Sequence, residues 1–288
     1  MTQLDIRPIA GSLGAEIHGI DLKSGIDRET IGAIEQALLE HLVVFLPEQN
    51  ISAEQHIAFG EAYGSLTTDH PSYLPTHPDH KEIVVLAGQE GGRADLWHTD
   101  ITISPEPPMG SILHMRTSPE YGGDTMFANL YAAYDALSDK MKTYLEGVVA
   151  YHDLMGTVKT VMRELSAKVN PADPGTEIGE GMAGFAKLDL PSAHHPVIRT
   201  HPKTGRKCLF VNPTFTSHIV NLPMAEGDAV LDFLYRHSTQ PEFLCRRRWT
   251  EGDIGFWDNR CTMHYAIADY SDAPRVIHRV TIQGEAPT

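Results

Sequence analysis

Leu96-Trp97-His98-Thr99-Asp100 is the stretch of this sequence around which the other features can be placed. It follows the pair Gly91-Gly92 and precedes the β-branched run Ile101-Thr102-Ile103, a context typical of an extended strand. Alternate residues of a strand project to the same face, so we expect His98 and Asp100 to point together. An imidazole and a carboxylate are two of the three ligands in the 2-His-1-carboxylate triad that binds non-haem Fe(II). The alternative is an aspartate that orients a surface histidine, and a third ligand would decide between them.

A second histidine far along the chain can supply that ligand. The apolar run Gly255-Phe256-Trp257 predicts a strand that enters the polar turn Asp258-Asn259-Arg260, and His264 follows this turn. Strands that are distant in sequence become neighbours in a jelly roll, so His264 can meet His98 through the fold.

Two arginines near the C-terminus add charge to the same site. In Arg275-Val276-Ile277-His278-Arg279, strand geometry places Arg275, Ile277 and Arg279 on one face and His278 on the other. Guanidinium groups that point into a barrel are costly unless they bind anions. Arginine also grips a carboxylate by two parallel hydrogen bonds. We therefore expect an inward-facing site with a metal and two anion-binding side chains.

Short strands separated by Gly and Pro turns dominate the rest of the chain. Helical spacing occurs at 27–41, 52–63, 129–145 and 225–238, and strand patterns occur at 4–22, 43–45, 83–86, 111–116, 125–128, 148–152, 197–199, 208–211, 243–249, 254–257 and 276–282. This predicts a mainly β fold with decorating helices (α+β), a β-sandwich or jelly roll, in one domain over residues 1–288. Residues 156–196 are rich in breakers and predict either a lid or a passive surface insertion.

Composition excludes several classes of protein. The formal net charge of −15 gives nucleic-acid binding no electrostatic support. The longest strongly apolar run, 42–46, is too short for a membrane span, and the first twenty residues lack the apolar core of a signal peptide. The three cysteines (Cys208, Cys245, Cys261) are far apart and fit reduced thiols in a cytoplasmic protein.

A set of motifs in fixed order makes a family resemblance specific. The set is W-H-T-D (97–100), G-G-D-T (122–125), His201-Pro202 with Gly205-Arg206, W-D-N-R (257–260), H-Y-A (264–266), and the pair Arg275 and Arg279. Together these motifs resemble the taurine/2-oxoglutarate dioxygenase family of Fe(II) enzymes, over about residues 4–285.

This resemblance implies a double-stranded β-helix core and a set of site residues. His98, Asp100 and His264 would be the catalytic iron ligands, and Thr125 and Arg275 would bind the far carboxylate of 2-oxoglutarate. Arg279 would lie near the cosubstrate and the anionic head of the prime substrate. The substrate pocket would be lined by a His-Pro-x-Tyr loop and an aromatic side chain, which correspond here to His70, Tyr73 and Phe215.

The resemblance also implies the reaction. Fe(II), 2-oxoglutarate and O2 would hydroxylate a small organic anion next to its heteroatom, with release of succinate and CO2. Halogenases of the family lack the carboxylate ligand, so Asp100 favours hydroxylation. We further expect a homo-oligomer, a dimer or tetramer.

One departure from the taurine enzyme bears on the substrate. Where that enzyme has an acid and an amide for the ammonium of taurine, this chain has Arg93 and Ala94, with Asp95 displaced by one residue. The pattern favours an amine-free alkyl sulfonate or alkyl sulfate. The alternatives are an aryloxyalkanoate or other carboxylate, and taurine itself.

Other classes of protein remain as competing interpretations. A metal-binding jelly roll without enzymatic activity would not need Thr125 and Arg275, and a serine hydrolase would need a G-x-S-x-G motif that is missing. Formation of succinate from 2-oxoglutarate would distinguish the dioxygenase from both.

Overall fold

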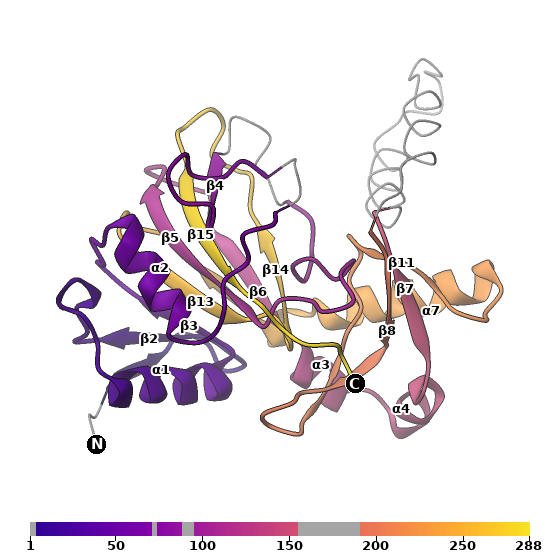
Figure 1. The fold of residues 1–288 in the computed structure, drawn as a ribbon. Coiled ribbons are helices and arrows are strands. Elements are labelled where there is room, and N and C mark those ends of the chain that lie inside the picture. Colours follow the sequence, from indigo (N-terminus) through magenta and orange to yellow (C-terminus); the bar gives the residue numbers. More distant parts are fainter. Residues whose placement is uncertain (1–3, 71–73, 88–94, 155–190) are drawn as a thin grey trace, which may run out of the picture.

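Two β-sheets that face each other form the centre of the molecule (Figure 1). The structure, a computed structural model, describes residues 4–70, 74–87, 95–154 and 191–288. The larger sheet has the strand order β1-β2-β3-β13-β5-β15-β4 and the smaller one the order β12-β6-β14. The large-sheet strands are β1 (Asp5–Pro8), β2 (Ala15–His18), β3 (Val43–Leu46), β4 (Ile83–Ala87), β5 (Gly110–Thr117), β13 (Ile254–Asp258) and β15 (Val276–Ile282), and the small-sheet strands are β6 (Thr125–Asn129), β12 (Leu244–Arg247) and β14 (Thr262–Ala266).

The central strands are apolar on both faces because both faces are covered. In β3, Val43 and Phe45 pack into the core between the two sheets, whereas Val44 and Leu46 pack into a second core on the outer side. This alternation follows from the strand period of two. The inner core joins side chains of both sheets, Leu113 and Phe127 among them. The arrangement is a double-stranded β-helix, so the prediction of a mainly β, jelly-roll fold with decorating helices is confirmed.

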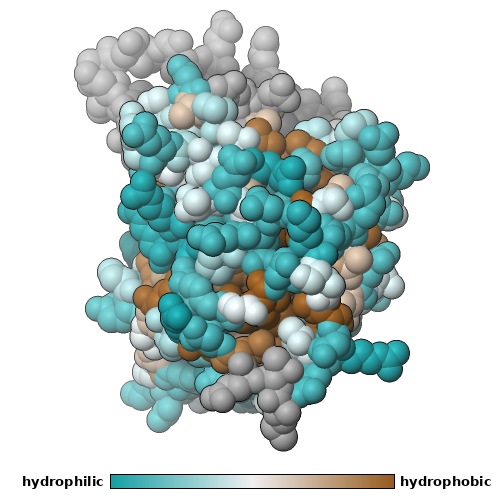
Figure 2. Space-filling model, turned by 90° about the vertical axis from the view of Figure 1, so that its left-hand side faces the viewer, coloured by the Kyte–Doolittle hydropathy of each residue, from teal (hydrophilic) through white to brown (hydrophobic). Residues whose placement is uncertain are grey.

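Helices cover the outer face of the large sheet. α1 (Arg28–His41) and α2 (Ala53–Glu61) lie against it in Figure 1. Their ends match the sequence signals: Asp27 caps α1, and Ser52 with Gln55 forms the capping box expected for α2. The face of the molecule in Figure 2 is mostly hydrophilic, with a hydrophobic band in its lower half. No helix among the described residues combines the length and apolarity that a membrane crossing needs.

A third core lies beside the two main sheets. Its elements are the helices α3 (Leu130–Asp135), α4 (Asp139–Leu145) and α7 (Met224–Ser238), the sheet β11-β7-β8 (β7 Val149–His152, β8 Ala193–Pro196, β11 Thr216–Ile219) and the pair β9 (Ile198–Thr200) and β10 (Lys207–Leu209). Two 3₁₀ turns, η1 (Leu22–Ser24) and η2 (Pro241–Phe243), complete the described elements.

The structure corrects two expectations and the end of a third. The single helix expected over 129–145 is two, because the Ser138 side chain accepts a hydrogen bond from the Met141 N–H and starts α4. Of the expected lid, 156–190 lies outside the described residues, and the end of it forms β8, which pairs with β7. The strand expected through His98 and Asp100 is a one-residue bridge at His98 followed by a turn.

Two buried histidines and a half-buried one on the large sheet and α2 predict an acid-sensitive fold. His114 and His278 are paired on β5 and β15, and the His56 ring lies 5.7 Å from that of His114. Burial is the main cause that lowers the pKa of His56 to about 3 and those of His114 and His278 to about 4, with added repulsion from neighbouring histidines and Arg116. Unfolded histidine titrates near pH 6.5, so between pH 6.5 and 4 the unfolded chain binds more protons than the folded one.

We therefore expect the free energy of unfolding of the metal-free protein to fall by about 2–4 kcal/mol from pH 7 to pH 5, the lower end allowing for solvent screening at His278. Urea denaturation at a series of pH values measures this. His278→Gln should flatten the pH dependence. Equal stability at pH 5 and 7 would contradict the assignment of these histidines as neutral.

Candidate functional site: a buried His-Asp-His centre

His98 and His264 lie side by side because their backbones pair. The His98 N–H donates to the His264 carbonyl at 3.0 Å, and the His264 N–H donates to the His98 carbonyl at 2.8 Å. Their ring centroids are 4.1 Å apart. This backbone bridge joins the segment around Trp97 to β14. The two distant histidines therefore meet through the fold, as the sequence predicted.

Asp100 completes a group of three ligand atoms. Its Oδ1 lies 3.6 Å from His98 Nε2 and 3.9 Å from His264 Nε2. All three residues are buried, and one ligand atom from each lies within 4.8 Å of the others. Two imidazoles and one carboxylate on one side of a cavity are the donor set that suits Fe(II).

The protonation states of the group are those that a metal needs. His98 Nδ1 lies 2.8 Å from the Leu96 carbonyl, so Nδ1 carries the proton and Nε2 presents its lone pair to the centre. Burial lowers the pKa of His98 and, more strongly, that of His264. Burial alone would raise the pKa of Asp100, but the charge of Arg279 beside it holds this pKa well below its usual value. The centre therefore has neutral imidazoles and an ionised carboxylate.

Two side chains hold the Asp100 carboxylate in place. Arg279 Nη1 donates to Oδ1 at 3.0 Å and to Oδ2 at 3.2 Å, and the Ser111 hydroxyl donates to Oδ2 at 2.9 Å. Sequence reasoning placed Arg279 at the site but missed Ser111. The available signal was a polar residue next to the apolar pair Ile112-Leu113 of β5.

A cavity between the two sheets extends from the histidines to Arg275. Its wall includes His98, His264, Thr125, Arg275, Arg279 and the ring of Trp257. Two of the buried donors on this wall, Trp257 Nε1 and Arg279 Nε, have no hydrogen-bond partner among the described residues. A cavity with unpartnered N–H groups and two guanidinium groups fits an oxygen-rich dianion such as 2-oxoglutarate.

The far end of this cavity is built around Arg275. Its side chain is 5% exposed, and burial lowers its pKa. Arg275 Nε donates to the Gly123 carbonyl at 3.0 Å, and within the described part of the chain no carboxylate lies at ion-pair distance from it. Gly122 and Gly123 both have positive φ, and a Cβ at Gly123 would lie 3.1 Å from the Arg275 side chain. The glycines of the G-G-D-T motif thus allow the arginine to approach the turn closely.

Thr125 presents a hydroxyl proton to the same end of the cavity. Its Oγ1 accepts a hydrogen bond of 2.8 Å from Trp249 Nε1. A hydroxyl has one proton to donate, and because the indole occupies an acceptor position, that proton is free to point at a ligand. Thr125 and Arg275, both on the cavity wall, can therefore bind one carboxylate together.

The structure describes part of the expected substrate wall. The Phe215 ring lies edge-on to His98, with centroids 6.4 Å apart. His70 is half-buried, neither of its ring nitrogens has a hydrogen-bond partner among the described residues, and burial together with the charge of Arg279 lowers its pKa. Tyr73, Arg93 and Ala94 lie outside the described residues.

A second group, His201, Asp258 and Cys261, has metal-ligand composition but a different role. His201 Nδ1 accepts from two backbone N–H groups at 3.2 Å, so its Nε2 carries the proton and donates to Asp258 at 3.1 Å. Arg260 clamps the same carboxylate through Nε at 2.8 Å and Nη2 at 2.7 Å. Because burial raises the pKa of Cys261 and Arg260 already neutralises Asp258, the group is a structural ion-pair network.

A jelly roll with a buried 2-His-1-carboxylate centre defines a class of non-haem iron proteins, and comparisons with known proteins identify the family. The profile described as "Taurine catabolism dioxygenase TauD, TfdA family" matches residues 5–281. An alkylsulfatase of Acinetobacter baylyi is 36% identical, over 99% of this chain and 87% of the relative. An alpha-ketoglutarate-dependent sulfate ester dioxygenase of Pseudomonas putida is 33% identical, over 99% of this chain and 91% of the relative.

A solved structure described as a taurine dioxygenase from Burkholderia xenovorans has a TM-score of 0.82 and 34% identity, over 99% of this chain and 91% of the other. The chain therefore belongs to the TauD/TfdA family. It is a 2-oxoglutarate-dependent dioxygenase, whose cofactor set is Fe(II), 2-oxoglutarate and O2. The family and the cofactors expected from the sequence are confirmed.

Proposed function

We propose that this dioxygenase hydroxylates a small, amine-free organic anion next to its heteroatom, with alkyl sulfates and alkyl sulfonates as the preferred class. Bound iron would supply O2 activation, and 2-oxoglutarate would leave as succinate and CO2. The observation that carries the proposal is the buried Arg279, whose Nε has no hydrogen-bond partner among the described residues and which lines the same cavity as His98 and His264. His70 lies near enough for the charge of Arg279 to lower its pKa. The names of the Acinetobacter and Pseudomonas relatives support sulfate esters as substrates.

We assign the site residues on the geometry described above. His98 Nε2, His264 Nε2 and the Asp100 carboxylate would hold iron, and Thr125 with Arg275 would bind the far carboxylate of 2-oxoglutarate. Arg279 would orient Asp100 and face the cosubstrate and the anionic head of the substrate. Phe215 and His70 would line the substrate side, and Tyr73 remains a sequence-based prediction for the same wall.

Hydroxylation of the carbon bound to the ester oxygen would give an unstable product. A carbon that carries both a hydroxyl and a sulfate ester oxygen collapses to an aldehyde and inorganic sulfate, and a sulfonate gives an aldehyde and sulfite. The enzyme would thus release the sulfur group of its substrate without hydrolysing it.

The substrate class is tested by kcat/KM for taurine, butanesulfonate, hexyl sulfate and phenoxyacetate. An ammonium without an acceptor in an apolar pocket costs several kcal/mol, whereas each buried methylene gains roughly 0.8 kcal/mol. We expect the amine-free sulfate or sulfonate to exceed taurine at least about tenfold, equivalent to about 1.4 kcal/mol. The highest value for phenoxyacetate would establish the alternative, an aryloxyalkanoate dioxygenase. The highest value for taurine would refute the interpretation of positions 93 and 94 and direct attention to Asp95.

We also propose that residues 1–288 act as one dioxygenase domain, in a cytoplasmic homo-oligomer (dimer or tetramer). The three cysteines, all free and buried, support a reducing compartment. Light scattering of the purified protein at several concentrations measures the oligomeric state, and a concentration-independent monomer would contradict this part of the proposal.

A further inference from the structure

Asn259 lies beside Asp100, and its side-chain amide forms hydrogen bonds with backbone groups. It is fully buried. Its Oδ1 accepts from the Asp100 N–H at 2.8 Å, and its Nδ2 donates to the Asp100 carbonyl at 3.0 Å and to the Pro108 carbonyl at 3.1 Å. One amide side chain therefore binds both backbone groups of the carboxylate ligand.

The backbone at Asp100 needs such support because the next residue has an unfavourable conformation. Ile101 has φ of +50°, in the left-handed region that β-branched residues rarely adopt. A conformation of this kind persists only where surrounding contacts impose it. Asp100 is the first residue of the turn that contains Ile101. The shape of the turn therefore sets where the Asp100 carboxylate lies relative to the two imidazoles.

Neighbouring contacts fix other atoms of the ligand segment. Ser111 and Arg279 hold the Asp100 carboxylate, and Thr99 Oγ1 donates to the Thr262 carbonyl at 2.9 Å. Among the hydrogen bonds of the described residues, those that reach the Asp100 N–H and carbonyl come from Asn259. Asn259 also follows β13 directly and precedes β14, so it ties Asp100 to the segment that carries His264.

We propose that Asn259 is a positioning residue of the metal centre: it imposes the backbone turn that aims Asp100 at the metal. The proposal rests on the assignment of His98, Asp100 and His264 as the ligands. Asn259 acts through Asp100 and does not touch the metal. Its loss should therefore weaken metal binding and distort the coordination geometry, beyond any general loss of stability.

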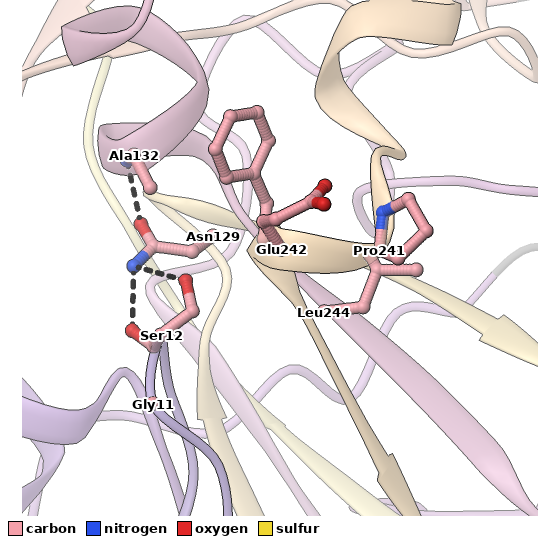
Figure 3. Close-up of a pocket in the computed structure, with 8 residues that line it drawn as sticks. Gly11, Ser12, Asn129, Ala132, Pro241, Glu242 and Leu244 are labelled. Carbon is pink, nitrogen blue, oxygen red and sulfur yellow. Dashed lines mark hydrogen bonds between the residues drawn. The ribbon is translucent and has the colours of Figure 1, made fainter.

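A second buried asparagine provides a matched control. Asn129 is also buried, its Oδ1 accepts from the Ala132 N–H at 3.0 Å, and its Nδ2 donates to the Ser12 carbonyl at 2.8 Å. Figure 3 shows these bonds at a surface pocket between the loop of Gly11 and Ser12, α3 and η2. Asn129→Ala thus removes a similar set of hydrogen bonds. None of the hydrogen bonds of the Asn129 side chain reaches His98, Asp100 or His264.

The experiment measures Co(II) binding by calorimetry and the visible spectrum of the Co(II) protein, with the melting temperature recorded for each variant. We expect Asn259→Ala to weaken Co(II) binding 10- to 100-fold, the range typical when the outer partner of a ligand is lost, and to change the Co(II) absorption bands. Asn129→Ala should lower the melting temperature but keep the wild-type affinity within twofold and the wild-type spectrum.

A second variant keeps the test independent of folding yield. Asn259→Asp is of the same size and can still accept from the Asp100 N–H, but it has lost both donors, so weaker binding and a changed spectrum are expected here too. Wild-type affinity and spectrum in the Asn259 variants would overturn the proposal. If instead the wild-type protein binds no Co(II), or His98→Ala binds it equally well, the ligand assignment itself fails.

Discussion

Removal of any one of His98, Asp100 and His264 by substitution to alanine is expected to abolish Fe(II) binding at micromolar metal. Loss even of an outer partner of a ligand typically costs 10–100-fold in affinity, so loss of a direct ligand should cost at least about 100-fold. Asp100→Ala has a further consequence, because it leaves the buried Arg279 without the carboxylate that it now contacts at 3.0 Å. Anaerobic calorimetry with Fe(II) measures the effect.

The second His-Asp pair of the chain supplies the control. His201 and Asp258 are buried at 3.1 Å from each other, as close as a ligand pair, but Arg260 already neutralises the carboxylate. His201→Gln should lower stability and leave one Fe(II) bound per chain. Full Fe(II) affinity in an alanine variant of the first group would remove that residue from the centre, and loss of iron in His201→Gln would place the centre elsewhere.

The three candidate ligands could be brought together from the sequence although the local structure expected around them was wrong. The prediction rested on residue types and on motif order, and neither depends on whether residues 96–103 form a strand. The β-branched run 101–103 favoured a strand, but contacts from distant segments impose a turn instead: Asn259 binds the Asp100 backbone, and Thr99 bonds to Thr262. Tertiary contacts of this kind override local propensity and leave no local signal.

The direction of Arg279 was predicted more completely, because strand geometry decides which way it faces. Arg279 and Ile277 lie on β15, whose two neighbours β4 and β5 fix its register, and alternation places both on the cavity wall. Arg275, one residue before this strand, lines the same wall. By contrast, the contacts of Ser111 and the partners of Asn259 depend on which distant segments of the chain meet in the fold. The expected substrate wall includes His70 and Phe215, which come from segments far apart in the chain, and a single sequence does not specify how such segments pack.

Arg275→Ala is expected to raise the KM for 2-oxoglutarate far more than the KM for the prime substrate. Loss of a buried arginine that clamps a carboxylate typically costs about 2–5 kcal/mol, or roughly 30- to several thousand-fold. The physical reason is that Arg275 is a buried cation without an ion-pair partner among the described residues, in a cavity where the Thr125 hydroxyl can join it. Arg275→Lys keeps the charge but loses the fork geometry, so we expect an intermediate KM.

Two comparisons separate this role from a structural one. Arg275 Nε also supports the Gly123 turn, and an arginine that only held this turn would lose stability on substitution without a change in the KM for 2-oxoglutarate. The exposed Arg248, whose guanidinium donates to the Glu120 carbonyl, is the matched control, and Arg248→Ala should leave this KM unchanged. A 2-oxo acid without the far carboxylate extends the test: the wild-type enzyme should use it much less efficiently than 2-oxoglutarate, and Arg275→Ala should abolish most of that preference. If the preference persists in Arg275→Ala, the far carboxylate binds elsewhere in the cavity.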